Sequence, residues 1–202
     1  MEIRFDAGTH EYRVDGVVVP SVTQALSPIS PWDGKPAGYH ADRGTRVHLG
    51  TELYDQRNLM DFQKFLELNP DTQGYIRAYL DFLAEFSPKW EAIEWIGAHP
   101  NLRYAGTVDR IGAVNGGNYV VDIKTGKANP LYGVQLAAYH RLATDTGGQF
   151  GYLGGRAVLQ LSSNGSFRFI PLPPEELESD WGVFRSCLVV YNWRRAHGIG
   201  GN

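Results

Sequence analysis

Two carboxylates and an ammonium group lie close together in the segment spanning residues 106–126, GTVDRIGAVNGGNYVVDIKTG. Asp109 falls on one predicted strand and Asp122 on the next, with a Gly-rich turn between them. Asp122 and Lys124 are two residues apart, so both side chains point to the same face of their strand. Carboxylate oxygens suit hard cations such as Mg²⁺ or Mn²⁺, and a nearby Lys can hold a water molecule or offset phosphate charge. The residues alone leave a second interpretation open, a ladder of ion pairs on a surface hairpin.

The elements that must position these residues alternate between strands and helices. A hairpin is predicted around Asp15-Gly16, a helix over 39–54, and an amphipathic helix from Asn69-Pro70 to about Ser87. Further along the chain we expect strands at 91–98, 103–114 and 118–124, a helix over 130–143, a hairpin around Asn164-Gly165 and a final helix from about Pro174. This order predicts an α/β fold with a mixed central β-sheet flanked by helices and preceded by an N-terminal β-hairpin.

Composition narrows the class of protein. The chain has 202 residues, of which 43% are hydrophobic and 20% charged, as expected of a globular fold. It shows no apolar run of the ~20 residues that a membrane span needs and no signal peptide, so we expect no membrane partner. Cys187 is the single cysteine, which excludes an internal disulfide framework and fits a reducing, cytoplasmic location in a bacterium or a phage-infected host cell.

The net charge of −3, from 19 Lys and Arg against 22 Asp and Glu, argues against a histone-like nucleic-acid binder. It does not exclude an enzyme that gathers acidic groups at a metal site and reaches nucleic acid through a local basic surface.

Four motifs occur in an order that resembles the PD-(D/E)XK nuclease superfamily, in particular the RecB-type branch that includes phage-encoded exonucleases. They are R-G-T-R-V-H ending at His48, GTVD ending at Asp109, DIK ending at Lys124, and Q-L-A-A-Y from Gln135 to Tyr139. Val108 stands where the name-giving Pro occurs in relatives, and Asp122 stands where many have Glu; neither change removes a ligand. The motifs cover residues 39–145.

The resemblance implies a restriction-endonuclease-like core in one nuclease domain over residues 1–202. Residues 1–35 would form the N-terminal hairpin and loop, 36–145 the motif-bearing core, and 146–202 a C-terminal hairpin and helix.

The resemblance also implies the site. His48, Asp109, Asp122 and the backbone carbonyl of Ile123 would bind one or two Mg²⁺ or Mn²⁺ ions. Lys124 would activate water or stabilise the transition state. Gln135 and Tyr139, four apart on one helix face, would position the Lys, the water or DNA phosphates, the alternative being polar packing against the sheet.

Other residues have weaker assignments. Glu52, one helical turn after His48, could orient the imidazole, and Glu94 could add a further acidic group. Four basic residues flank the motifs as candidate phosphate contacts or as plain solvated charges: Arg43, Arg46, Arg110 and Lys127. Three aromatic residues could stack on bases or pack in the core: Trp32, Tyr39 and Tyr104.

The implied function is a metal-dependent DNA nuclease, an exonuclease by its branch, that hydrolyses phosphodiester bonds with metal-activated water. The substrate would be single- or double-stranded DNA in recombination, repair or phage DNA processing. A recombination or single-strand-binding protein is an expected partner, and a homo-oligomer is compatible with the branch. The alternatives are a non-catalytic nucleic-acid-binding module on the same fold and a structural or assembly protein.

Overall fold

A five-stranded mixed sheet forms the centre of the protein, seen in a computed structural model that describes residues 1–30, 39–147 and 149–199. The strand order follows the sequence, β4-β5-β6-β7-β8. Neighbouring strands run antiparallel except β6 and β7, which are parallel. The bounds are β4 Lys89–Ala98, β5 Ala105–Val114, β6 Gly117–Lys124, β7 Gly155–Leu161 and β8 Phe167–Pro171. The predicted mixed α/β fold is thus confirmed.

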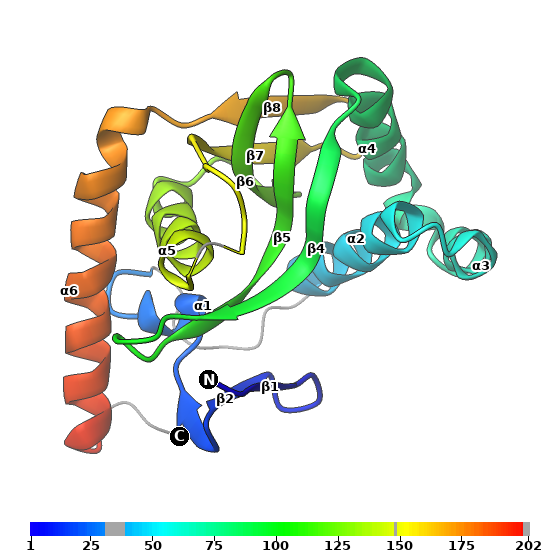
Figure 1. Cartoon of the computed structure of the whole chain (residues 1–202). Helices are drawn as coiled ribbons and strands as arrows, with labels where there is room; N and C mark the ends of the chain where they lie inside the picture. The colour runs from blue at the N-terminus through cyan, green and yellow to red at the C-terminus, as the bar shows by residue number, and fades with distance from the viewer. Residues whose placement is uncertain (31–38, 148, 200–202) are drawn as a thin grey trace.

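Helices cover both faces of this sheet (Figure 1). One apolar cluster joins the sheet to α5 (Leu131–Asp145), α6 (Leu177–Ala196) and the short α1 (Val22–Ala25). A second cluster joins the opposite face to α2 (Tyr39–Asp55) and α4 (Gln73–Phe86). Two 3₁₀ turns, Pro70–Thr72 and Pro174–Glu176, lead into α4 and α6.

The side chains of strand β6 alternate between the two faces of the sheet, and the candidate site residues lie on one face. Val121 and Ile123 are fully buried in the cluster beneath α2 and α4, whereas Val120 packs in the cluster beneath α5. Because side chains alternate along a strand, Asp122 and Lys124 share the α5 side with Val120. Since β6 and β7 are parallel, their connection must cross over the sheet, and helix α5 makes that crossing. The helix is thereby placed next to the end of β6 that carries Lys124.

Three N-terminal strands form a small antiparallel sheet, with β1 at Ile3–Asp6, β2 at Glu11–Val14 and β3 at Val17–Val19. The predicted hairpin corresponds to β2 and β3, and β1 adds one strand to it. The Ala105 backbone N–H donates to the Pro20 carbonyl at 3.0 Å, and Arg103 Nη2 donates to the Val14 carbonyl at 3.0 Å. These bonds fix the small sheet to the beginning of β5.

Two helices were not predicted. Helix α1 begins at a capping box, in which Ser21 Oγ accepts from the Gln24 backbone and the Gln24 side chain accepts from the Ser21 backbone. Helix α3 (Leu59–Leu68) follows Asn58 as N-cap and buries Phe62 and Phe65 against Ile76. Both are short, and short apolar runs carry little periodicity.

Among residues 1–30, 39–147 and 149–199, no helix combines the length and apolar character needed to cross a membrane.

The glycine of the GTVD segment has a packing role. A Cβ at Gly106 would lie 2.8 Å from Tyr139 Cε1 and 3.1 Å from Val22 Cγ2. Only a residue without a side chain therefore lets α5 and α1 approach β5 this closely at a point three residues before Asp109.

We predict that Gly106→Ala lowers the free energy of unfolding by about 1–3 kcal/mol, because the buried Tyr139 ring must shift to admit the methyl group. Urea denaturation measures this change. Gly182→Ala is the matched control, since a Cβ there meets nothing within 4 Å on α6 and Ala favours helix. Equal loss in both variants would contradict the assigned role of Gly106.

Candidate metal centre and catalytic cleft

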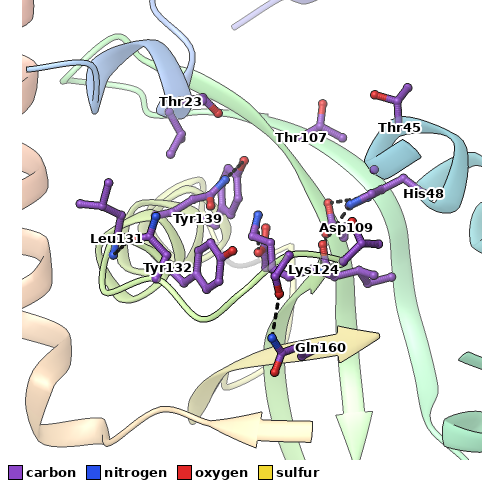
Figure 2. A pocket seen from close by; sticks show the side chains of 18 of the residues that line it. Thr23, Thr45, His48, Thr107, Asp109, Lys124, Leu131, Tyr132, Tyr139 and Gln160 are labelled. Carbon is purple, nitrogen blue, oxygen red and sulfur yellow. Dashed lines mark hydrogen bonds and ion pairs between the residues drawn. The ribbon is translucent and has the colours of Figure 1, made fainter. Parts of the chain in front are cut away.

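One open cavity of about 1260 Å³ brings the motif residues together. Its walls are the N-terminal sheet, α2, α5 and the ends of β5, β6 and β7 (Figure 2). His48, Asp109, Asp122, Lys124, Gln135 and Tyr139 all line it. Residues that are distant in the sequence therefore face the same cavity.

His48, Glu94 and Asp109 form the tightest group of candidate ligands. His48 Nδ1 lies 3.4 Å from Asp109 Oδ1 and 3.8 Å from Glu94 Oε1. One ligand atom from each residue falls within 4.8 Å of the others. An imidazole and two carboxylates in this arrangement can bind a divalent cation such as Mn²⁺ or Mg²⁺.

Backbone geometry brings Glu94 into this group. It lies on β4 between the pairs Ile93/Arg110 and Trp95/Val108, hence opposite Asp109. Its φ of 46° is in the left-handed region, which a residue with a side chain occupies at a cost of roughly 1–3 kcal/mol. Glu94, which the sequence suggested as a further acidic group, is therefore one of three converging candidate ligands.

The second part of the site is the Asp122–Lys124 pair. Lys124 Nζ lies 2.6 Å from Asp122 Oδ2, and Asp122 is 2% exposed. The Lys124 ammonium therefore holds this buried carboxylate oxygen. Burial and the negative charge of Asp109 raise the pKa of Asp122 to about 6, although Lys124 opposes the shift.

Strands β5 and β6 are tied together through the site. The Ile123 backbone N–H donates to Asp109 Oδ2 at 2.6 Å. On its other side, the Ile123 carbonyl lies 3.0 Å from His48 Nε2. Asp109, His48 and the Ile123 carbonyl, three of the four predicted ligand groups, are therefore in contact.

Charge coupling controls the protonation of this group. Burial disfavours the charged imidazolium of His48, but the charges and hydrogen bonds of Asp109 and Glu94 outweigh it and raise the pKa of His48 to about 10. Burial likewise opposes ionisation of Asp109, but His48 and Lys124 keep its pKa below the usual value. The metal-free site thus holds a proton on His48.

Gln135 and Tyr139 face the cleft from α5, as the Q-x-x-x-Y spacing implied. Gln135 Nε2 donates to the Tyr139 hydroxyl at 3.1 Å. Tyr139 is 7% exposed, and burial together with Asp122 and Asp109 raises its pKa well above the usual value. Because its oxygen accepts from Gln135, the phenol proton remains available to a group in the cleft.

The structure corrects the assignment of Arg110 as a DNA contact. Its side chain is fully buried and cannot reach a phosphate. Its Nε donates to Asp55 Oδ2 at 2.6 Å, and its Nη1 donates to Glu94 Oε1 at 3.1 Å and to the Asp109 carbonyl at 2.6 Å. Arg110 therefore contacts Glu94 and the Asp109 backbone from the interior of the protein.

Sequence reasoning missed two members of this buried network, Asp55 and Tyr79. The Tyr79 hydroxyl donates to Asp55 Oδ2 at 2.5 Å, and the Arg110 guanidinium lies over the Tyr79 ring at 5.8 Å. Asp55 lies seven residues after His48, on the same face of α2. That spacing was the available sequence signal.

The remaining basic candidates differ in position. Arg43 and Lys127 line the cleft; Arg43 donates to the Thr125 carbonyl at 3.2 Å and lies over the Tyr75 ring, and Lys127 is exposed. Arg46 instead binds Asp71, with both guanidinium Nη atoms at 2.6 and 2.9 Å.

Glu52 does not contact the His48 ring but accepts from Gln56 Nε2 at 2.8 Å. The groups beside the His48 ring are the Asp109 and Glu94 carboxylates and the Ile123 carbonyl. Tyr104 is fully buried and donates to the Ala138 carbonyl at 3.0 Å, so of its two predicted roles the structure shows core packing. Trp32 and the side chain of Tyr39 lie outside the described residues.

We predict that Arg110→Met lowers the free energy of unfolding by about 3–5 kcal/mol, because it leaves Asp55 buried without its cation. The double variant Arg110→Met with Asp55→Leu should recover much of this loss. Chemical denaturation measures both. Arg4→Met removes an exposed ion pair with Glu2 and should change stability little. Wild-type stability of the single Arg110 variant would refute the buried network.

Comparison with known proteins bears on this geometry. No curated protein sequence matches the chain. A candidate exonuclease from Eubacterium rectale shares the fold with a TM-score of 0.51 at 11% identity, over 86% of this chain and 81% of that chain. An alkaline exonuclease from Laribacter hongkongensis aligns with a TM-score of 0.38 at 16% identity, over 88% and 93% of the two chains.

The sequence profile of the PD-(D/E)XK nuclease superfamily matches residues 26–188. This span contains every strand of the central sheet and the motif residues that line the cleft, from His48 to Tyr139. The chain belongs to the PD-(D/E)XK nuclease superfamily.

Proposed function

We propose that this nuclease is a divalent-metal-dependent deoxyribonuclease that digests DNA from its ends. The observation that carries the proposal is the convergence, in one cleft, of the His48–Glu94–Asp109 group with the buried Asp122–Lys124 pair. A buried carboxylate–ammonium pair beside a candidate metal site in an open cleft favours a catalytic site over a non-catalytic binding module.

The donor set fits a hard or borderline divalent ion. We assign His48, Asp109, Asp122 and the Ile123 carbonyl as ligands, with Glu94 as a further carboxylate. Two observations support this: Asp122 is a buried carboxylate that lines the cleft, and one ligand atom each from His48, Glu94 and Asp109 lies within 4.8 Å of the others. One or two Mg²⁺ or Mn²⁺ ions would supply Lewis acidity toward a phosphoryl oxygen and lower the pKa of a bound water.

Lys124 is suited to act as a charged hydrogen-bond donor rather than as a base. Burial disfavours its charged form, but Asp122 and Asp109 outweigh burial and raise its pKa above the usual value. The ammonium also lies 5.1 Å from the centre of the Tyr132 ring. A charged, anchored Lys124 can therefore donate hydrogen bonds that orient a water molecule and stabilise negative charge on the transferred phosphoryl group.

Substrate positioning falls to α5 and the rim of the cleft. Tyr139, held by Gln135, can donate its phenol proton to a phosphate oxygen, and Arg43 and Lys127 are the basic residues at the rim. DNA is the substrate we propose. A place in recombination, repair or phage DNA processing, a protein partner and a homo-oligomer stay predictions.

We predict that Asp122→Asn and Lys124→Met each lower cleavage about 10²–10³-fold, the usual cost of removing one charge-stabilising group. End-labelled linear DNA and covalently closed circular DNA serve as substrates, with Mg²⁺ or Mn²⁺ and with EDTA. Linear DNA should be shortened and circles left intact. The control is Lys64→Met, an exposed position on α3. Full activity of both site variants would refute the catalytic assignment, and cutting of circles would refute end-dependence.

We also predict that metal binding near pH 7.5 releases about one proton. His48 has its pKa raised to about 10 in the metal-free site and must lose that proton to bind a metal. Asp122, with a pKa of about 6, is already ionised at this pH. Mn²⁺ titration by calorimetry in two buffers of different ionisation enthalpy measures the release. It should disappear in His48→Gln, and a buffer-independent heat in the wild type would contradict the assignment.

A further inference from the structure

Three aromatic side chains form a contiguous group on the N-terminal sheet, beside the cleft. Phe5 stacks on Tyr12 with ring centres 4.5 Å apart, and the His10 ring meets Phe5 edge-on at 5.3 Å and Tyr12 at 5.9 Å. We call Phe5, His10 and Tyr12 the aromatic lip. Tyr12 is buried, Phe5 is half-buried and His10 is exposed.

The aromatic lip is continuous with the proposed active site. His10 and Tyr12 line the same cavity as Asp109, Asp122 and Lys124. The Tyr12 hydroxyl lies 2.8 Å from Thr107 Oγ1, and Thr107 precedes Asp109 by two residues on β5.

The turn that carries His10 is well fixed. Asp6 Oδ1 accepts from the backbone N–H groups of Gly8 at 2.8 Å and Thr9 at 3.2 Å. His10 itself has a φ of 54°, a left-handed conformation that few residues with side chains adopt. The imidazole is thus presented from a structured turn.

Core packing explains only part of the aromatic lip. Tyr12 belongs to the apolar cluster beneath the small sheet, with Phe5 packed against it. His10 contacts both rings edge-on but is itself exposed at the cavity wall. The neighbouring acids Asp6 and Glu11 disfavour a phosphate at this point. A flat, uncharged aromatic group is the better match.

We propose that the exposed His10 ring of the aromatic lip, supported by Phe5 and Tyr12, stacks on an unpaired base of single-stranded DNA within a few nucleotides of the bond that is cleaved. This proposal rests on the proposed nuclease function and gives it a substrate class. Every base has an aromatic face, so such stacking tolerates any sequence. Bases inside a duplex have both faces covered, so the aromatic lip selects single-stranded DNA or an unpaired end.

The test is stacking measured directly on DNA, in an Asp122→Asn background with Mg²⁺ to suppress cleavage. Single-stranded oligonucleotides carry the fluorescent base 2-aminopurine at one position each, scanned along the strand. We expect quenching at one or two adjacent positions. His10→Ala should abolish that quenching and weaken single-strand binding about 5- to 150-fold, the range typical of one stacked base, whereas His10→Phe should retain both.

The matched control is His197→Ala, which removes another exposed imidazole stacked on an aromatic ring, Trp193, at the end of α6. It should leave quenching and affinity unchanged, and thermal melting should show that all variants are folded. Blunt duplex DNA should bind equally well to the background protein and to His10→Ala.

Two results would overturn the proposal. Unchanged quenching and affinity in His10→Ala, with cleavage intact in the otherwise wild-type protein, would refute the aromatic lip alone. Failure of the wild type to cleave or bind any DNA would refute the proposed function and the aromatic lip together.

Discussion

The buried guanidinium of Arg110 is the interaction on which the rest of the site depends. It binds Asp55 and Thr51 of α2, Glu94 of β4 and the carbonyl of Asp109 on its own strand, and it lies over Tyr79 of α4. Two helices and two neighbouring strands of the sheet are therefore joined at one planar cation. An arginine suits this place because its fixed fork of donors can satisfy several acceptors at once.

This network also makes a crowded acidic site tolerable. Glu94, Asp109 and Asp122 would repel one another if all three were ionised without compensation. Arg110 and Lys124 supply positive charge from opposite sides, and the protonated His48 supplies a third positive group in the metal-free protein. Burial of the carboxylates thus remains compatible with folding before any metal binds.

The sequence predicted those features that depend on residues close together in the chain. The strands around Asp109 and Asp122, the helix with Gln135 and Tyr139, and the mixed sheet follow from turn residues and periodicity. Arg110 could not be placed correctly, because a charged residue is exposed by default and its partner Asp55 is 55 residues away. The role of Glu94 depends on a left-handed backbone conformation opposite Asp109, which no spacing rule reveals.

The alternation of side chains along β6 has a consequence for how this protein tolerates insertions and deletions. Val121 and Ile123 fill the core, and Asp122 and Lys124 face the cleft. A shift of one residue would exchange these two sets, burying charge where packing is needed and placing aliphatic groups where chemistry occurs. Fold and activity would be lost in the same step. We therefore expect insertions to be tolerated in the turns that bound the strand, such as the one at Asn115 and Gly116, where an added residue leaves the alternation of β6 intact.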